Sequence, residues 1–427
     1  MKKKIHIILT FSIVLSLAGC YYQATPETTG ALPEQTETED LPSLRDCVVS
    51  SDGLGEDAVF GTCLNGMGIR DKKLMQLIEK HYNAVTLENE LKPDAMFGYS
   101  NDRPRAGSIH EEELSGKTIL VPTLDHSRAD AILDTIVKWN EDNPESQIKV
   151  RGHVLVWHSQ TPEWFFHEDY DKSRDYVSKE EMDQRLEWYI KSMLEYYTGE
   201  NSRYKGLFYG WDVVNEAVND RNGSYRTDTE SGSDSLSDPI HGTKSSWWKI
   251  YGSEEYIINA FRYANLYASE EVDLYYNDYN ECNAVKKKGI IKLIESVKAA
   301  DGTRIDGFGM QGHYSVNNPT KDQIIKAASE YAAAAGKVMI TELDVKSSMF
   351  YNGSEEALPE EYERQKDYYR DIYDAMKELG SEGVNVSGIV FWGAVDTYSW
   401  LRDKGERPLL FDGDYKAKPA FYAFSGE

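Results

Sequence analysis

Eight apolar segments alternate with helix-like segments along most of this 427-residue chain. The predicted strands are 58–64, 83–88, 150–157, 207–216, 272–278, 307–314, 337–344 and 388–395. Near-continuous apolar runs are typical of parallel strands buried on both faces. Eight of them separated by helices predict an α/β fold, the (β/α)8 TIM barrel. A doubly wound sheet is disfavoured because no glycine-rich turn follows the first strand.

Helical periodicity fills most of the gaps between these strands. Helices are predicted over 73–82, 128–143, 179–197, 255–267, 286–299, 322–335 and 362–379. Two stretches, 94–127 and 220–246, are longer than ordinary connections. Both leave the carboxyl-terminal ends of strands, where a barrel keeps its site. We therefore expect long insertions in the βα loops.

Polar and aromatic side chains gather at the ends of six of the predicted strands. They are Glu88, Asn89 and Lys92 after the second strand, His153 and Trp157 in the third, Asn215 and Glu216 in the fourth, Gln311 and His313 in the sixth, Glu342 and Asp344 in the seventh, and Trp392 and Trp400 in and after the eighth. A single such residue is more often a helix cap or a solvated charge. Six strand ends that converge on one barrel mouth favour a catalytic site.

Glu216 and Glu342 are the carboxylates that best fit glycosidic bond cleavage. They end the fourth and seventh strands, on different sides of the barrel mouth. In such a pair one carboxyl protonates the leaving oxygen, and the other attacks the anomeric carbon or activates water. Asp344 is two residues from Glu342 and His313 ends the neighbouring predicted strand, so both are candidates to hold Glu342 in its charged form through hydrogen bonds.

Several motifs occur in one order along the chain. They are LENELK at 87–92, RGHVLVWHSQTP at 151–162, WDVVNEA at 211–217, YNDYN at 276–280, GMQGH at 309–313 and ITELD at 340–344, followed by Trp392 and Trp400. From residue 58 to the end, the chain resembles glycoside hydrolase family 10, whose main activity is endo-1,4-β-xylanase. The resemblance implies xylan and xylo-oligosaccharides as ligands, and no cofactor. One departure is Pro93-Asp94 after Lys92, where many members carry Trp-Asp.

The resemblance also implies a role for each site residue, in a retaining double displacement. Glu342 matches the nucleophile and Glu216 the acid/base. Asn215 would donate to the 2-hydroxyl of the attacked sugar. The remaining assignments place His153, Trp157 and Gln311 at the central subsite, Glu88, Asn89 and Lys92 at the next sugar away from the leaving group, and Trp392 and Trp400 in an aromatic wall. Such a wall would crowd the hydroxymethyl arm of glucose and favour xylan over cellulose.

The amino terminus is typical of an exported lipoprotein. Three lysines precede an apolar run too short to span a membrane, and the run ends in Leu17-Ala18-Gly19-Cys20, which resembles a bacterial lipobox. We expect a signal peptide at 1–19 and a lipid on Cys20. A flexible acidic linker at 20–46 and a catalytic domain at 47–427 would follow. The expected location is the cell surface or outer membrane, with the lipid as the contact to the membrane.

The net charge of −25 disfavours nucleic acid as a partner and leaves neutral polysaccharide open. No CxxC or CxxH spacing indicates a metal site. Cys47 and Cys63 form a candidate disulfide in an oxidising compartment. We expect a monomer. Two alternatives stay open: a lipid-anchored glycan-binding protein on a non-catalytic barrel, and a β-1,4-glucanase. Retention of both Glu216 and Glu342 favours the enzyme.

Overall fold

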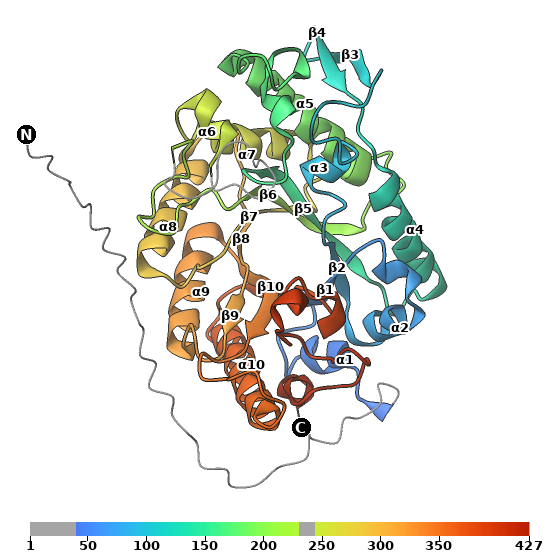
Figure 1. Cartoon of the computed structure of the whole chain (residues 1–427), viewed down its shortest axis with the longest axis vertical. Helices are drawn as coiled ribbons and strands as arrows, with labels where there is room; N and C mark the ends of the chain where they lie inside the picture. Colours follow the sequence, from blue (N-terminus) through green and yellow to red (C-terminus); the bar gives the residue numbers. More distant parts are fainter. Residues whose placement is uncertain (1–39, 230–243, 427) are drawn as a thin grey trace, which may run out of the picture.

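The computed structural model describes residues 40–229 and 244–426. Its main sheet has the strand order β11-β1-β2-β5-β6-β7-β8-β10-β9, and β10 also pairs with β11. That additional pairing closes eight strands into a ring, and all the pairs in the ring are parallel. Helices surround the ring in Figure 1. The (β/α)8 TIM barrel is confirmed.

The ring strands lie close to the predicted segments. They are β1 (Val59–Leu64), β2 (Ala84–Leu87), β5 (Lys149–Trp157), β6 (Phe208–Asn215), β7 (Asp273–Asp278), β8 (Gly307–Met310), β10 (Val338–Lys346) and β11 (Val386–Phe391). Apart from Val59, Lys149, Tyr209, Asp273, Val386, Ser387 and the last residue of β5 and of β10, their residues are buried. Burial on both faces explains the near-continuous apolar runs in the sequence.

Two strands end earlier than predicted. The segment predicted as one strand over 307–314 stops at Met310 and resumes as β9 (His313–Ser315). Gly312 interrupts it at φ +79°, a conformation that residues with a Cβ rarely adopt. His313 then pairs with Asp344 on β10, outside the ring. Strand β11 likewise ends at Phe391, so Trp392 begins the loop that follows it.

Seven of the helices follow the predicted segments closely, and three short ones, α1, α3 and α6, were not predicted. The helices are α1 (Leu44–Val48), α2 (Lys72–His81), α3 (Pro93–Met96), α4 (Ser127–Asp142), α5 (Lys179–Thr198), α6 (Ser246–Tyr251), α7 (Glu255–Tyr267), α8 (Ala284–Ala299), α9 (Lys321–Ala335) and α10 (Leu358–Ser381). Short 3-10 helices are 68–70, 163–166, 168–170, 396–398, 402–404 and 419–423. In α5, a stripe of residues at spacings of three and four from Met182 to Tyr197 is buried, and Ser178 caps the first turn by accepting from the Glu181 N–H.

The first insertion, 94–127, has secondary structure of its own. It begins within α3 and continues into an antiparallel hairpin of β3 (Ile109–Leu114) and β4 (Lys117–Pro122). In Figure 1 the hairpin projects from the top of the molecule, with α3 between it and the barrel. In the second insertion, Tyr225 forms an isolated pairing with Val218, which lies just before the insertion. Residues 230–243 lie outside the described residues.

The described chain enters the fold at the amino-terminal end of the barrel. Leu41 and Leu44 are buried there. Ser43 Oγ donates to the Lys80 carbonyl near the end of α2, and Arg45 donates to the Gln147 carbonyl just before β5. The predicted signal peptide and Cys20 lie outside the described residues. Within 40–229 and 244–426, no helix is both long and apolar enough to cross a membrane.

The suggested disulfide between Cys47 and Cys63 is not formed. Cys47 lies on α1, at the amino-terminal end of the barrel. Cys63 is buried near the end of β1 and lines a small cavity with Glu88, at the opposite end. The two thiols therefore cannot meet without moving the barrel wall.

Candidate active site

A cavity of about 420 Å³ opens at the carboxyl-terminal ends of the barrel strands. Its lining residues are Lys92, His153, Trp157, Asn215, Glu216, Tyr279, Asn280, Gln311, His313, Glu342, Lys346, Trp392 and Trp400. All of these except Tyr279, Asn280 and Lys346 were predicted from the sequence. Of the other predicted residues, Asp344 hydrogen-bonds to His313 and Asn89 to Lys92, and Glu88 lies beside Asn89 at the end of β2. The barrel thus brings the predicted polar strand ends into one site.

Glu342 is buried on β10, with 4% of its surface exposed. Its Oε1 accepts a hydrogen bond from Asn277 Nδ2 at 2.7 Å. Its Oε2 lies 3.2 Å from His313 Nε2. Both carboxylate oxygens are therefore held by donors, which fixes the direction in which this group faces the cavity.

The surroundings of Glu342 keep it ionised. Burial by itself would raise its pKa, but the hydrogen bond from His313 and the charges of His153, His313 and Arg151 outweigh burial and lower the pKa to about 2. For His313, burial opposes the charged form, whereas Asp344 and Glu342 raise its pKa to about 10. Between these values the site holds a carboxylate beside an imidazolium. A carboxylate in this state is a competent nucleophile.

Asp344 holds His313 through the ring nitrogen that does not face Glu342. His313 Nδ1 donates to Asp344 Oδ2 at 2.9 Å, and Trp400 Nε1 donates to the same oxygen at 2.7 Å. The His313 and Trp400 rings also make an edge contact, with centroids 5.3 Å apart. Asp344 therefore orients both the imidazole that supports Glu342 and the exposed indole at the rim.

Glu216 follows the last residue of β6 and is only partly buried. Its φ is +56°, an uncommon conformation for a residue with a Cβ, and its N–H donates to the Asn277 carbonyl at 3.0 Å. Gln311 Nε2 donates to its Oε1 at 2.9 Å, and Trp157 Nε1 donates to its Oε2 at 3.0 Å. The backbone turn and two neutral donors aim this carboxyl into the open cavity.

A chain of amides joins the two carboxylates. Gln311 Nε2 contacts both Glu216 and Asn215 Oδ1, and Asn277 Nδ2 contacts both Asn215 Oδ1 and Glu342. Asn277 had no predicted role, although it stands within the YNDYN motif. The available signal was an amide in the interior of a strand buried on both faces, where polar groups need partners. Gly309 leaves room for it, since a Cβ there would lie 2.3 Å from Asn277 Oδ1.

A buried ion pair under the site was also missed. Arg151 and Asp212 are both fully buried and lie 2.9 Å apart. Asp212 also accepts from His153 Nδ1 at 2.7 Å, and Arg151 donates to the Thr341 carbonyl at 3.0 Å. Removing one partner would leave an uncompensated charge in the interior. This pair ties three strands together immediately behind Glu342.

The side of the cavity next to β2 is polar and aromatic. Glu88 accepts from Asn65 Nδ2 at 2.7 Å, and Lys92 Nζ donates to Asn89 Oδ1 at 3.0 Å. Lys92 Nζ also lies 5.2 Å from the Trp157 ring centroid and 5.8 Å from that of Trp392. Trp392 is buried, whereas Trp400 is 47% exposed. A sugar ring in this part of the cavity would have hydrogen-bond partners for its hydroxyl groups and flat aromatic faces to pack against.

The second insertion contacts the catalytic end through Arg226, a residue that no sequence pattern singled out. Arg226 is buried, and its Nε donates to the Glu216 carbonyl at 3.0 Å. Its guanidinium also reaches the Tyr279 hydroxyl at 3.4 Å. Tyr279 in turn donates to Asp220, and Asp220 pairs with the buried Lys286 at 2.5 Å. The first residues of this insertion thus hold the backbone of Glu216 and one wall of the cavity.

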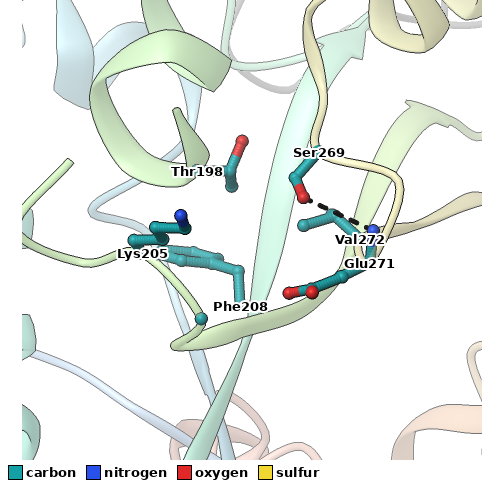
Figure 2. A pocket seen from close by; sticks show the side chains of 7 residues that line it. Thr198, Lys205, Phe208, Ser269, Glu271 and Val272 are labelled. Carbon is teal, nitrogen blue, oxygen red and sulfur yellow. Dashed lines mark hydrogen bonds between the residues drawn. The ribbon is translucent and has the colours of Figure 1, made fainter. Parts of the chain in front are cut away.

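A much smaller pocket lies at the amino-terminal end of the barrel. Figure 2 shows this pocket, of about 10 Å³, lined among others by Thr198, Lys205 and Glu271. Its drawn hydrogen bond, from the Glu271 N–H to Ser269 Oγ, closes a turn. In the described part of the chain, no cluster of three or more histidine, cysteine or acidic side chains is arranged to hold a metal ion.

Comparisons with known proteins agree with this geometry. The model of glycosyl hydrolase family 10 matches residues 51–426. Endo-1,4-beta-xylanase B of Paenibacillus barcinonensis is 33% identical, over 82% of this chain and 90% of that protein. The endo-1,4-beta-xylanase of Geobacillus stearothermophilus is 31% identical, over 90% and 97%. The chain spans 30% of the bifunctional endo-1,4-beta-xylanase XylA of Ruminococcus flavefaciens, at 33% identity over 81% of this chain.

Solved structures show the same architecture. The intracellular xylanase TsXylA of Thermoanaerobacterium saccharolyticum, a mutant in complex with xylotetraose, matches with a TM-score of 0.70 at 30% identity. The match covers 91% of this chain and all of that one. With the family model matching nearly the whole described chain and the paired carboxylates in place, this protein belongs to glycosyl hydrolase family 10.

Proposed function

We propose that this protein hydrolyses internal β-1,4-xylosidic bonds of xylan by a retaining double displacement. The observation that carries the proposal is the pair of carboxylates on one cavity, Glu342 clamped in its charged form and Glu216 at the open rim. The named activities of the relatives, which are endo-1,4-β-xylanases, support xylan as the substrate.

In the first step Glu342 Oε attacks the anomeric carbon while Glu216 gives its proton to the leaving glycosidic oxygen. This forms a glycosyl ester on Glu342 and releases the other part of the chain as an alcohol. The ester removes the negative charge of Glu342. In the second step Glu216 takes a proton from water, the water oxygen attacks the same carbon, and Glu342 leaves as a carboxylate. Two inversions give net retention.

The neighbouring residues have matching roles. Asn215 stands between Gln311 and Asn277, which keeps its amide in place to donate to the 2-hydroxyl of the attacked sugar. Glu88, Asn89 and Lys92 would hold the next sugar, and His153 and Trp157 the floor and side of the central one. Trp392 and Trp400 form the wall expected to exclude the hydroxymethyl arm of glucose.

The test is hydrolysis of glucuronoxylan, linear xylan and cellulose oligomers by the full-length protein, with product anomers followed by NMR. Short xylo-oligosaccharides appearing first as the β-anomer are expected. An α-anomer at the start would contradict retention, and equal cleavage of cellulose oligomers would contradict the role of the tryptophan wall. Binding to xylan without any product would contradict hydrolysis and favour the glycan-binding alternative.

We also infer that the protein is an exported lipoprotein, anchored through a diacylglycerol on Cys20, at the cell surface or outer membrane, and monomeric. The lipobox-like Leu17-Ala18-Gly19-Cys20 supports this. Cells labelled with radioactive palmitate should yield a labelled protein, and the Cys20→Ala variant should lose both label and membrane attachment. A Cys20→Ala protein still firmly bound to membranes would contradict the anchor. Light scattering of the detergent-solubilised protein measures its mass and so tests whether it is monomeric.

A further inference from the structure

A second cavity, of about 300 Å³, lies at the base of the β3–β4 hairpin in the first insertion. Its apolar floor is formed by Phe97 and Leu124, and its lining includes Arg105 and Asp125. The Thr123 N–H donates to the Ser108 carbonyl at 2.9 Å, which joins the two ends of the hairpin. The Asp125 N–H donates to the Met96 carbonyl at 2.7 Å, which joins the hairpin to α3.

The second cavity and the catalytic one lie at opposite ends of a single short helix, α3. Lys92, the residue before α3, lines the catalytic cavity, and Phe97, the residue after it, lines the second. Five residues of helix rise about 8 Å. Phe97 thus lies about that far along the chain from Lys92, on the scale of a substituent or a further sugar on a chain whose neighbouring units occupy the catalytic cavity beside Lys92.

The charges in the second cavity favour an anion. Asp125 is already neutralised by Arg128, 3.0 Å away, and also accepts from Ser127. Among the described residues, the exposed Arg105 guanidinium has no ion-pair partner. In a protein with a net charge of −25, an arginine left without a carboxylate at a cavity is a candidate ligand-binding group.

We propose that this cavity binds a carboxylate-bearing substituent of the uronic-acid class on the xylan chain, with Arg105 pairing with its carboxylate. The proposal rests on the proposed function and adds a preference for substituted xylan. The sugar ring of the substituent packs on Phe97 and Leu124, and its carboxylate meets the guanidinium at the rim.

The experiment compares two xylo-oligosaccharides of equal length, one carrying a single 4-O-methylglucuronate and one without substituents. Cleavage by the full-length protein is measured for the wild type, Arg105→Gln and Arg103→Gln. Arg103 is the matched control, since it is an exposed arginine two residues away that does not line the cavity. We expect Arg105→Gln to lower kcat/KM about 10-fold for the substituted oligosaccharide only, the scale of one charge-assisted contact. Added salt should reduce the wild-type preference.

Equal losses on both oligosaccharides, the same loss in Arg103→Gln, or no loss in Arg105→Gln would each overturn the proposal. If the wild type cleaves neither oligosaccharide, the proposed function fails, and calorimetric binding of the two then decides the cavity separately. If the wild type binds the uronate-bearing oligosaccharide more tightly and Arg105→Gln loses this preference, the proposal for the second cavity is still supported. Equal binding of both forms overturns it.

Discussion

Glu342 and Glu216 face the same cavity with the same side chain, yet their surroundings differ. Glu342 is buried, held by His313 and Asn277, with Arg151 and His153 nearby. Glu216 is partly exposed, at a positive φ, and among the described residues its carboxylate accepts from the neutral donors Gln311 and Trp157. Charged hydrogen-bond donors at one carboxylate and neutral donors at the other suit the nucleophile and acid/base roles proposed for them.

The largest effect is expected at Glu342. Glu342→Ala should lower kcat on xylan by at least ~10⁴-fold, because no covalent intermediate can form. Added azide should enter from the vacated side and give the α-glycosyl azide, identified by NMR. Recovery of a β-glycosyl azide would reverse the assigned roles.

A smaller and more selective loss is expected at Glu216. Glu216→Ala should lower activity on xylan by ~10²–10⁴-fold, since the leaving oxygen is no longer protonated. Aryl xylobiosides with good leaving groups should lose much less in the glycosylation step, which pre-steady-state kinetics can show. Azide should now give the β-glycosyl azide. Equal losses on all leaving groups would contradict the acid role.

Removing the His313 imidazolium beside Glu342 should make the surroundings of Glu342 more like those of Glu216. In the wild type the pKa of Glu342 is lowered to about 2, so it is ionised throughout the working range. His313→Asn removes a cause of that lowering, so the pKa rises and the acidic limb of kcat/KM should move to higher pH. An unmoved acidic limb would show that His313 only fills space.

The same linkage affects stability. Because the folded pKa of Glu342 lies below the ordinary 4.5, its ionisation stabilises the fold above pH 4.5, and this contribution is lost as the pH falls toward 2. Urea unfolding of the wild type and Glu342→Gln across this range measures it. Similar pH slopes for both would contradict the assigned cause.

The smallest effect is expected behind Glu216. Arg226→Lys keeps the charge but loses the fixed fork that reaches the Glu216 carbonyl and Tyr279, so we expect kcat to fall ~10-fold with little change in KM. Lys205→Ala, at the amino-terminal end of the barrel, is the control and should leave kcat unchanged (Figure 2). An unchanged kcat in Arg226→Lys would show that the backbone turn alone positions Glu216.

The sequence predicted the barrel and the cavity-facing residues because both leave local marks. Buried parallel strands are apolar runs, and site residues stand where those runs end. Contacts between residues far apart in the sequence have no such local pattern. The contacts of Asn277 with Glu342 and of Arg226 with Glu216 were therefore found only in the structure. The break at Gly312 and the hairpin at 109–122 were not predicted either. The positive φ of Gly312 and the pairing of the two hairpin strands both depend on neighbouring elements rather than on a local pattern.

The packing of α1 has a bearing on how the enzyme would meet its polymer. Leu41 and Leu44 dock the start of the described chain at the end of the barrel opposite the catalytic cavity. If Cys20 carries the proposed lipid, the tether would join the barrel at the end opposite its mouth. Long, insoluble chains that never approach the lipid surface would then reach the cleft, and the tether would set only how far out it stands.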